Sequence, residues 1–276
     1  MSILNAIILG LVQGVAEFLP ISSSGHLAIL QNLFGMTTAE NGHMFFDVLL
    51  HFGTLISICI VYWGEIVDMV REFFAFCRRR STPGGEQIHY PAARMLMMIV
   101  FGTLPLFVIL PFNDKVEQLY YHTAFIGVAL ILTGCILYVA DKMKPGRKTE
   151  GSMKVSDALI IGVCQAVATI PGLSRSGTTI AAGMATGLRR DYAVKYSFLL
   201  SLPAVLGANI LSLVKAVKAG IDASLIPAYL IGMAVAMVSG VFAIGLVKAI
   251  ANKGKFGCFS YYCWVVGVLA IVLTII

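Results

Sequence analysis

The stretch Gln13-Gly14-Val15-Ala16-Glu17-Phe18-Leu19-Pro20-Ile21-Ser22-Ser23-Ser24-Gly25-His26 joins an apolar approach, a proline, a cluster of serines and the start of another apolar run. A related stretch follows at an offset of 152 residues: Gln165-Ala166-Val167-Ala168-Thr169-Ile170-Pro171-Gly172-Leu173-Ser174-Arg175-Ser176-Gly177-Thr178. The two align without a gap. Their matching positions are Gln13/Gln165, Val15/Val167, Ala16/Ala168, Ser22/Ser174, Ser24/Ser176 and Gly25/Gly177. We therefore interpret them as the two halves of one active site.

The composition is that of an integral membrane protein. Of the 276 residues, 58% are hydrophobic and only 12% are charged, against roughly a quarter charged in soluble domains. Apolar runs of roughly 18 to 25 residues recur, each long enough to cross a hydrocarbon core of ~30 Å. Their helical length favours a helical bundle over a membrane barrel. The expected fold is an all-α polytopic membrane protein with six transmembrane helices and two re-entrant helical hairpins in an inverted-topology repeat.

We expect one membrane domain, residues 1–276, made of two repeats. Repeat one covers about 1–111 and opens with a re-entrant hairpin at about 1–34, broken between Pro20 and Gly25. Repeat two covers about 155–247 and opens with a hairpin at about 155–187, broken at Pro171-Gly172. The predicted full spans are 44–63, 94–111, 119–140, 193–214, 224–247 and 257–275. A weaker match, at an offset of 150, places Leu49-Leu50-His51-Phe52 over Leu199-Leu200-Ser201-Leu202.

Charge patterning predicts the orientation of the spans. Most Lys and Arg residues fall in four segments: a basic loop at 64–93 with a Pro83-Gly84-Gly85 turn, a second loop at 141–154, and the stretches 189–195 and 248–255. Residues 35–43 and 113–118 are polar connections. Because Lys and Arg concentrate on the cytoplasmic side of membrane proteins, we assign these four segments to the cytoplasm. The first hairpin then enters from the extracytoplasmic side and the second from the cytoplasm, so the two breaks meet near the midplane.

Several functional classes are disfavoured by the same counts. The net charge of +6 is explained by loop charges, so we expect no nucleic-acid partner. The six cysteines form no CxxC pair, and we interpret them as small buried hydrophobes. The first Lys or Arg is Arg71, so no cleavable signal peptide is expected.

Two charged side chains at the breaks indicate a functional site. An ionised side chain at membrane depth costs at least ~2.5 to 3.5 kcal/mol, so Glu17 and Arg175 need each other or a polar cavity. Pairing alone does not explain the hydroxyls gathered at the same breaks: Ser22, Ser23, Ser24, Ser174, Ser176, Thr178 and Thr179. Hydroxyls, an arginine fork and free N–H groups at two helix starts make a receptor for an oxyanion, specifically phosphate or pyrophosphate.

The residues allow more than one chemistry. Ser23 can attack phosphorus if His26 accepts its proton, or His26 can itself be the nucleophile. Gln13 and Glu17, four residues apart, can orient the base or hold a divalent cation. Two other interpretations stay open: Glu17 as an ion-coupling carboxylate, and Arg175 as a purely structural partner of Glu17.

Asp47 and His51 lie four residues apart on one helical face, and we expect both to be structural. Asp47 falls near a helix start, where a carboxylate is favoured.

The segments Gln13 to His26 and Pro171 to Thr179 resemble the two signatures of the bacterial undecaprenyl-diphosphate phosphatases, the bacitracin-resistance family. The resemblance covers the whole chain in length, span number and motif spacing. It implies hydrolysis of undecaprenyl diphosphate to undecaprenyl phosphate and inorganic phosphate, which recycles the lipid carrier for cell-wall synthesis and confers bacitracin resistance. It also implies a multi-pass protein of the bacterial inner membrane, with its site facing the extracytoplasmic side, and a divalent cation, Mg²⁺ or Ca²⁺.

The family's functional residues fall on this sequence as follows. The catalytic set is Glu17, Ser23, His26 and Arg175, with Ser23 as nucleophile candidate and His26 as general acid/base. The diphosphate-binding set is Ser22, Ser24, Gly25, Ser174, Arg175, Ser176, Gly177 and Thr178. The metal set is Glu17 and Gln13. Many family members have Glu where this chain has Gln13, so Glu17 is left as the one carboxylate of that set.

A transporter is the alternative from another class. Inverted repeats with broken helices are typical of lipid-phosphate flippases and ion-coupled carriers, and such a role can also be a second one. Besides the polyprenyl diphosphate and the lipid bilayer, we keep a homodimer among the expected partners.

Overall fold

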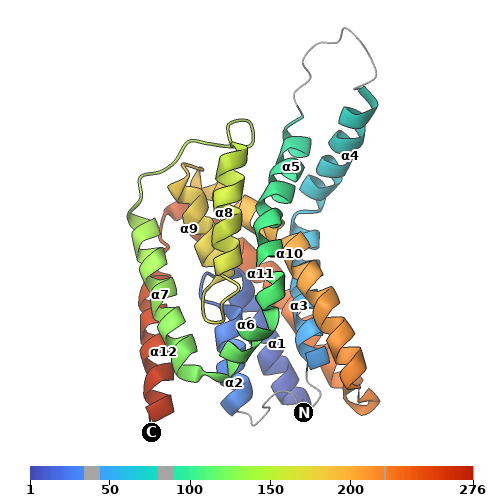
Figure 1. Ribbon diagram of the computed structural model, residues 1–276, viewed down its shortest axis with the longest axis vertical. Coiled ribbons are helices and arrows are strands. Elements are labelled where there is room, and N and C mark those ends of the chain that lie inside the picture. Colours follow the sequence, from blue (N-terminus) through green and yellow to red (C-terminus); the bar gives the residue numbers. More distant parts are fainter. Residues whose placement is uncertain (34–43, 80–89, 221, 276) are drawn as a thin grey trace.

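The computed structural model describes residues 1–33, 44–79, 90–220 and 222–275 (Figure 1). Over these residues the regular structure is helical, apart from one isolated bridge between Lys148 and Leu188. The α-helices are α1 (Ile3–Phe18), α2 (Ser23–Leu33), α3 (Met44–Val61), α4 (Trp63–Arg79), α5 (Pro91–Thr103), α6 (Asn113–Gln118), α7 (Thr123–Lys142), α8 (Val155–Val167), α9 (Arg175–Ala185), α10 (Arg190–Ala219), α11 (Ile226–Lys253) and α12 (Gly257–Ile275). Short 3₁₀ helices are η2 (Leu104–Val108), η3 (Leu110–Phe112), η4 (Leu119–Tyr121) and η5 (Ala223–Leu225).

Six segments in the described part of the chain are long and apolar enough to cross a membrane: Met44–Val61, Pro91–Phe112, Thr123–Lys142, Arg190–Lys218, Ala223–Lys253 and Gly257–Thr274. They coincide with the six predicted spans, so the all-α polytopic fold is confirmed. Large apolar side chains such as Phe242 and Val128 lie exposed on their outer faces, as expected where lipid replaces water.

The prediction of a basic loop over residues 64–93 is wrong for most of its length. Trp63–Arg79 forms α4, which continues from α3, and α5 begins at Pro91. The loop was predicted from its arginines, although apolar residues also recur in this segment with the spacing of an amphipathic helix. Met69 is one of them, and it is buried. Glu72 then joins α4 to α5, because its Oε2 accepts hydrogen bonds from the first free N–H groups of α5, at Ala92 (2.7 Å) and Ala93 (3.0 Å).

Two smaller differences concern the polar connections. The predicted polar turn at 113–118 is a short helix, α6. The predicted polar segment 35–43, Arg80 and the Pro83-Gly84-Gly85 turn lie outside the described residues.

Both helix breaks lie where the sequence predicts them. The helix α1 ends at Phe18 and α2 begins at Ser23, while α8 ends at Val167 and α9 begins at Arg175. Pro20 and Pro171 cannot continue a regular helix. Ser22 has a φ of 70° and Gly172 a φ of 90°, so each connection contains a residue in the left-handed region.

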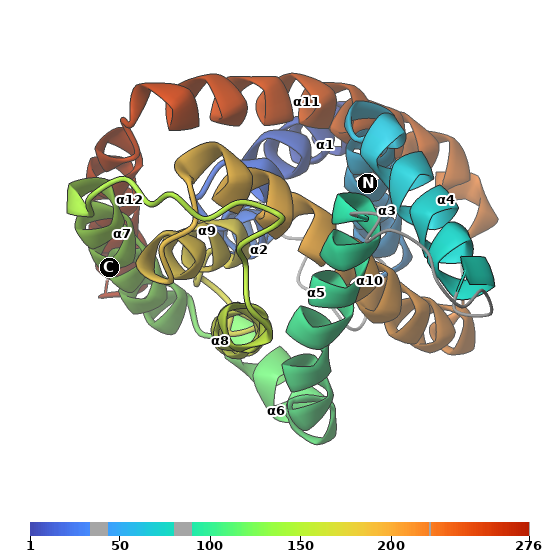
Figure 2. The same cartoon turned by 90° about the horizontal axis from the view of Figure 1, so that it is seen from above.

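The two broken pairs approach each other from opposite ends of the molecule. Figure 1 shows α1 and α2 at the lower end, where the N-terminus lies, whereas α8 descends from the upper end and α9 returns toward it. Seen from above, α2 and α9 lie near the centre, with α11, α12, α7 and α5 around them (Figure 2). This arrangement is the one that an inverted repeat requires. The repeat boundaries and the depth of the breaks in a bilayer stay predictions.

Glycines allow each pair's first helix to pack closely on a helix of the other repeat. A side chain at Gly10 of α1 would collide with the carbonyl oxygen of Gly232 in α11. A side chain at Gly162 of α8 would collide in the same way with Gly102 in α5. Gly10 and Gly162 match at the repeat offset. The close contacts of α1 with α11 and of α8 with α5 are therefore equivalent, and both join the two halves of the chain.

Candidate active site

The two helix breaks touch. Ser176 Oγ at the start of α9 donates a hydrogen bond to the carbonyl oxygen of Leu19 in the first break, at 3.4 Å. A Cβ atom added at Gly25 would lie 3.3 Å from the Cα of Gly172 in the second break. The glycines therefore bring the starts of α2 and α9 side by side.

Ser174 caps α9 through its side chain. Its Oγ accepts a hydrogen bond from the N–H of Gly177 (3.1 Å) and lies 3.3 Å from Ser176 Oγ. The backbone N–H of Ser174 donates to Thr133 Oγ1 of α7 at 3.0 Å. Arg175 is thus the first residue of a helix whose start is fixed on two sides.

The same hydrogen bonds recur at α2. Ser22 Oγ accepts from the N–H of Gly25 (3.3 Å) and lies 3.3 Å from Ser24 Oγ. The four serines of the predicted diphosphate-binding set are therefore engaged in contacts that shape the two helix starts: Ser22, Ser24, Ser174 and Ser176. The first backbone N–H groups of α2 and α9 have no acceptor within their own helices. These groups are the ones that can bind an anion.

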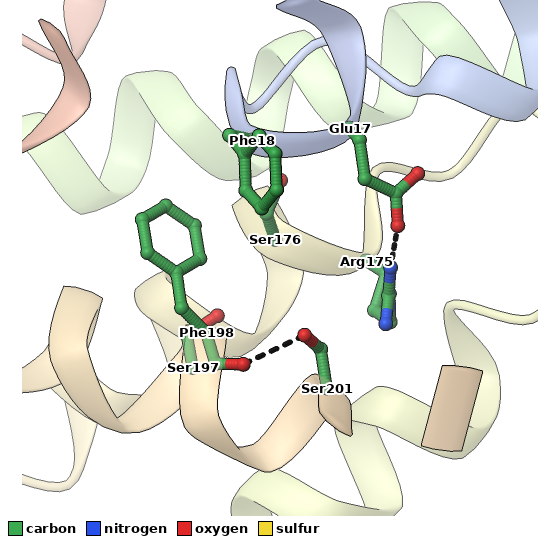
Figure 3. A pocket seen from close by; sticks show the side chains of 7 residues that line it. All are labelled: Glu17, Phe18, Arg175, Ser176, Ser197, Phe198 and Ser201. Atoms are coloured by element: carbon green, nitrogen blue, oxygen red, sulfur yellow. Dashed lines mark hydrogen bonds and ion pairs between the residues drawn. The ribbon is translucent and has the colours of Figure 1, made fainter. Parts of the chain in front are cut away.

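Glu17 is the side chain on which the two halves converge. Arg175 Nη2 donates to Glu17 Oε1, so the ion pair joins α1 to α9 (Figure 3). Ser23 Oγ donates to Glu17 Oε2 at 2.6 Å, and Gln13 Nε2 donates to the same oxygen at 3.1 Å. Both members of the pair are shielded, since the Glu17 side chain is 5% exposed and that of Arg175 is 23% exposed.

A cavity of about 10 Å³ adjoins the Glu17–Arg175 pair, which is about the space for one water molecule. It is lined by Glu17, Phe18, Arg175, Ser176, Ser197, Phe198 and Ser201. Figure 3 shows Glu17 and Arg175 pointing toward each other beside it. Ser197 and Ser201 belong to α10 and were not among the predicted site residues, because a serine in an apolar span carries no signal of its own.

His26 lies in the same turn as Ser23, but its two ring nitrogens have other partners. Its Nδ1 lies 2.7 Å from the carbonyl oxygen of Ser22, so Nδ1 carries the proton and donates. Nε2 is then an acceptor and receives the hydroxyl of Tyr262 in α12 at 2.8 Å. The two rings stack, with centroids 5.6 Å apart. The hydroxyl of Ser23 donates to Glu17, and neither ring nitrogen of His26 is its partner.

His51, which we expected to be structural, is brought into the site. Its Nδ1 lies 2.9 Å from Gln13 Nε2 and 3.8 Å from Glu17 Oε2. Its neighbour Asp47 accepts a hydrogen bond from Gln31 at 2.7 Å. An ionisable side chain within a membrane span is itself a functional signal, and it could have indicated His51 from the sequence.

Thr178, a predicted site residue, takes no part in this network. Its Oγ1 is buried without a hydrogen-bond partner among the described residues, and it borders an apolar groove on the α7 side of α9. Gln13, Glu17, Ser23 and Arg175 are thus joined by side-chain contacts, whereas Thr178 is not.

Comparison with known proteins identifies the family of this chain. The model of the family described as bacitracin resistance protein BacA matches residues 6–269. An undecaprenyl-diphosphatase of Carboxydothermus hydrogenoformans is 40% identical over 279 residues, covering 99% of this chain and 98% of the relative. Undecaprenyl-diphosphatases of Methanosphaera stadtmanae (36% identical over 282 residues, covering 100% of this chain and 99% of the relative) and Halothermothrix orenii (39% over 274 residues, 99% and 98%) are also similar over nearly their whole length. With nearly every residue inside the match, this chain belongs to the bacitracin resistance protein BacA family.

Proposed function

We propose that the protein is an integral membrane phosphatase that hydrolyses undecaprenyl diphosphate to undecaprenyl phosphate and inorganic phosphate. The observation that carries the proposal is the contact of Ser23 and Arg175 with the same carboxylate, at the junction of two broken helices. A nucleophilic hydroxyl, a base and a guanidinium are thereby within reach of one phosphoryl group. The similar undecaprenyl-diphosphatases of other organisms support the choice of lipid.

The geometry favours Ser23 as the nucleophile. Ser23 Oγ attacks the terminal phosphorus and its proton passes to Glu17 Oε2, 2.6 Å away. The bond from that phosphorus to the bridging oxygen breaks, so undecaprenyl phosphate leaves and Ser23 carries the phosphoryl group. Water then attacks the phosphoserine, the bond from phosphorus to Ser23 Oγ breaks, Glu17 returns its proton to Oγ, and inorganic phosphate is released. Arg175 stabilises the non-bridging oxygens in both steps.

His26 serves the second step in this scheme. Because Nε2 is its acceptor nitrogen and the side chain is partly exposed, it can take a proton from the attacking water. Both this role and the competing one, with His26 as nucleophile, require Nε2 to leave Tyr262. Trapped phosphoenzyme separates the two, since phosphoserine survives acid and phosphohistidine does not.

The wider setting is inferred from the fold and the family. We place the protein in the bacterial cytoplasmic membrane, with the diphosphate entering from the extracytoplasmic side and the polyprenyl tail remaining in lipid. Turnover there returns the lipid carrier to cell-wall synthesis. It also lowers the amount of diphosphate available to bacitracin, which gives resistance. A homodimer stays part of the proposal.

The donor set does not fit a divalent cation held by the protein alone. Glu17 is the one carboxylate, and its oxygens already accept from Arg175, Ser23 and Gln13. Gln13 presents its amide nitrogen to Glu17, and the described residues contain no cluster of three His, Cys, Asp or Glu side chains. We propose that any Mg²⁺ or Ca²⁺ needed for turnover arrives bound to the diphosphate oxygens.

The test is phosphate release from a C55 diphosphate by purified protein in detergent. Arg175→Ala should lower release by at least ~10²-fold, and Arg175→Lys should restore little, because a single ammonium lacks the planar fork. Arg189→Ala is the matched control, since Arg189 pairs with the exposed Asp191 and should leave release unchanged.

Near-normal release by Arg175→Ala would contradict the role of Arg175 as the phosphate clamp. Folded wild type that releases no phosphate, yet moves polyprenyl phosphate across liposomes, would replace the phosphatase with a transporter.

A further inference from the structure

His51 contacts the site through Gln13. His51 Nδ1 and Glu17 Oε2 are the two acceptors nearest Gln13 Nε2, at 2.9 Å and 3.1 Å. The amide nitrogen has two hydrogens, one for each acceptor. His51 must then keep Nδ1 unprotonated and point its Nε2–H elsewhere, and its side chain is 31% exposed.

The orientation of the Gln13 amide depends on these two acceptors. Gln13 is 0% exposed, and its Oε1 is buried with no hydrogen-bond partner in the described part of the chain. In the opposite orientation, Oε1 would face the Glu17 carboxylate and repel it. Without His51, one hydrogen of the buried Gln13 amide loses its acceptor. One of the two hydrogen bonds that fix the orientation of the amide is then lost.

The amide in turn helps to hold the carboxylate. Gln13 and Ser23 share Glu17 Oε2, while Arg175 takes Oε1. Glu17 can receive the proton of Ser23 only if Oε2 stays 2.6 Å from that hydroxyl. Losing the Gln13 donor frees the carboxylate to turn toward Arg175.

The backbone that carries His51 is well anchored. Two residues later in α3, a side chain at Gly53 would collide with the carbonyl oxygen of Met233 in α11. Ser57 Oγ donates to the carbonyl oxygen of Met237 at 2.7 Å. Because these contacts fix α3 against α11, His51 is suited to hold the Gln13 amide in place.

The repeat supports the assignment independently. Ser201 of α10, which aligns with His51, lines the cavity beside Arg175. The helix after each broken pair therefore places a polar side chain next to the charged residue of that pair.

We propose that His51 is a positioning residue for the phosphatase reaction, acting through Gln13 on Glu17. The inference rests on the proposed function. The charged or titratable groups that face His51 are Glu17 and Arg175.

A double-mutant cycle on kcat tests this proposal with His51→Ala, Gln13→Ala and the combined variant. His51→Ala should lower kcat by about 10-fold to 100-fold, as a small displacement of a reacting group does, and change KM less than ~2-fold. The combined variant should be no slower than Gln13→Ala, because the two residues act in series. Multiplying effects would overturn the proposal, and so would normal kcat in His51→Ala.

A conservative variant guards against a folding defect. Asparagine places Oδ1 as many bonds from Cβ as Nδ1 in histidine, so His51→Asn should restore kcat to within ~5-fold of wild type. A His51→Asn variant as slow as His51→Ala would instead assign proton transfer or ligation to the ring. His122→Asn, at the exposed start of α7, is the matched control and should be unchanged. Phosphate release by wild type in the same assay tests the proposed function separately.

Discussion

Glu17 accepts hydrogen bonds from three side chains: Gln13 of its own helix, Ser23 at the start of α2 and Arg175 at the start of α9. Each donor stabilises the ionised carboxylate at a place where an unpaired charge would be costly. The carboxylate thus joins the residues that follow both helix breaks, and it is placed to accept a proton from Ser23. A residue that would be a liability in a lipid-facing helix is stable here because three donors surround it.

Neighbouring serines should differ sharply when mutated. Ser23→Ala removes the hydroxyl that points at Glu17, and we expect phosphate release to fall by at least ~10²-fold. Ser24→Ala removes only a 3.3 Å contact with Ser22 and should cost less than ~10-fold. Steady-state release by the two variants measures the difference. Equal losses would mean that Ser23 is no more than part of the binding surface.

At the scale of elements, the helix starts carry the site. Arg175 is the first residue of α9, so the Ser174 cap controls where the guanidinium lies. Ser174→Ala should cost about 1 kcal/mol of stability, as the loss of an N-cap does, and should also reduce phosphate release at least ~5-fold.

Ser2→Ala provides the comparison for that variant. Ser2 caps α1 through the N–H of Asn5 at 3.1 Å, remote from the breaks. Its loss should cost similar stability without changing release. Thermal unfolding in detergent, alongside the phosphate assay, separates the two effects. If both variants lose activity in proportion to stability, the α9 cap has no special role.

At the scale of the whole molecule, the broken pairs enter from opposite ends (Figure 1). Together with the loop charges, this predicts Lys144 in the cytoplasm and Lys115 outside. The expectation that the cysteines are buried is wrong for Cys77, Cys135 and Cys258, which are exposed. After these three are replaced, cysteines introduced at the two exposed lysine positions should react differently with a membrane-impermeant maleimide. Only Lys115→Cys should be labelled in intact cells. Labelling of Lys144→Cys without permeabilisation would reverse the orientation.

The sequence by itself determined the class of protein, the six spans and the two helix breaks. Those features depend on local composition: apolar runs long enough for a bilayer, and prolines and glycines that interrupt helices. It also indicated Glu17, Ser23 and Arg175, because charged and hydroxyl side chains stand out in apolar surroundings. The sequence-based prediction was wrong at α4, which was predicted to be a loop because of its arginines although its apolar residues have helical spacing.

Only the tertiary structure decided which side chains meet. His51, Ser197 and Ser201 come from α3 and α10, and their approach to Glu17 and Arg175 depends on how those helices pack. The hydrogen bond that His26 receives from Tyr262 likewise depends on the position of α12. Contacts between segments distant in the chain are set by close packing over the whole fold, which no local pattern of residues records.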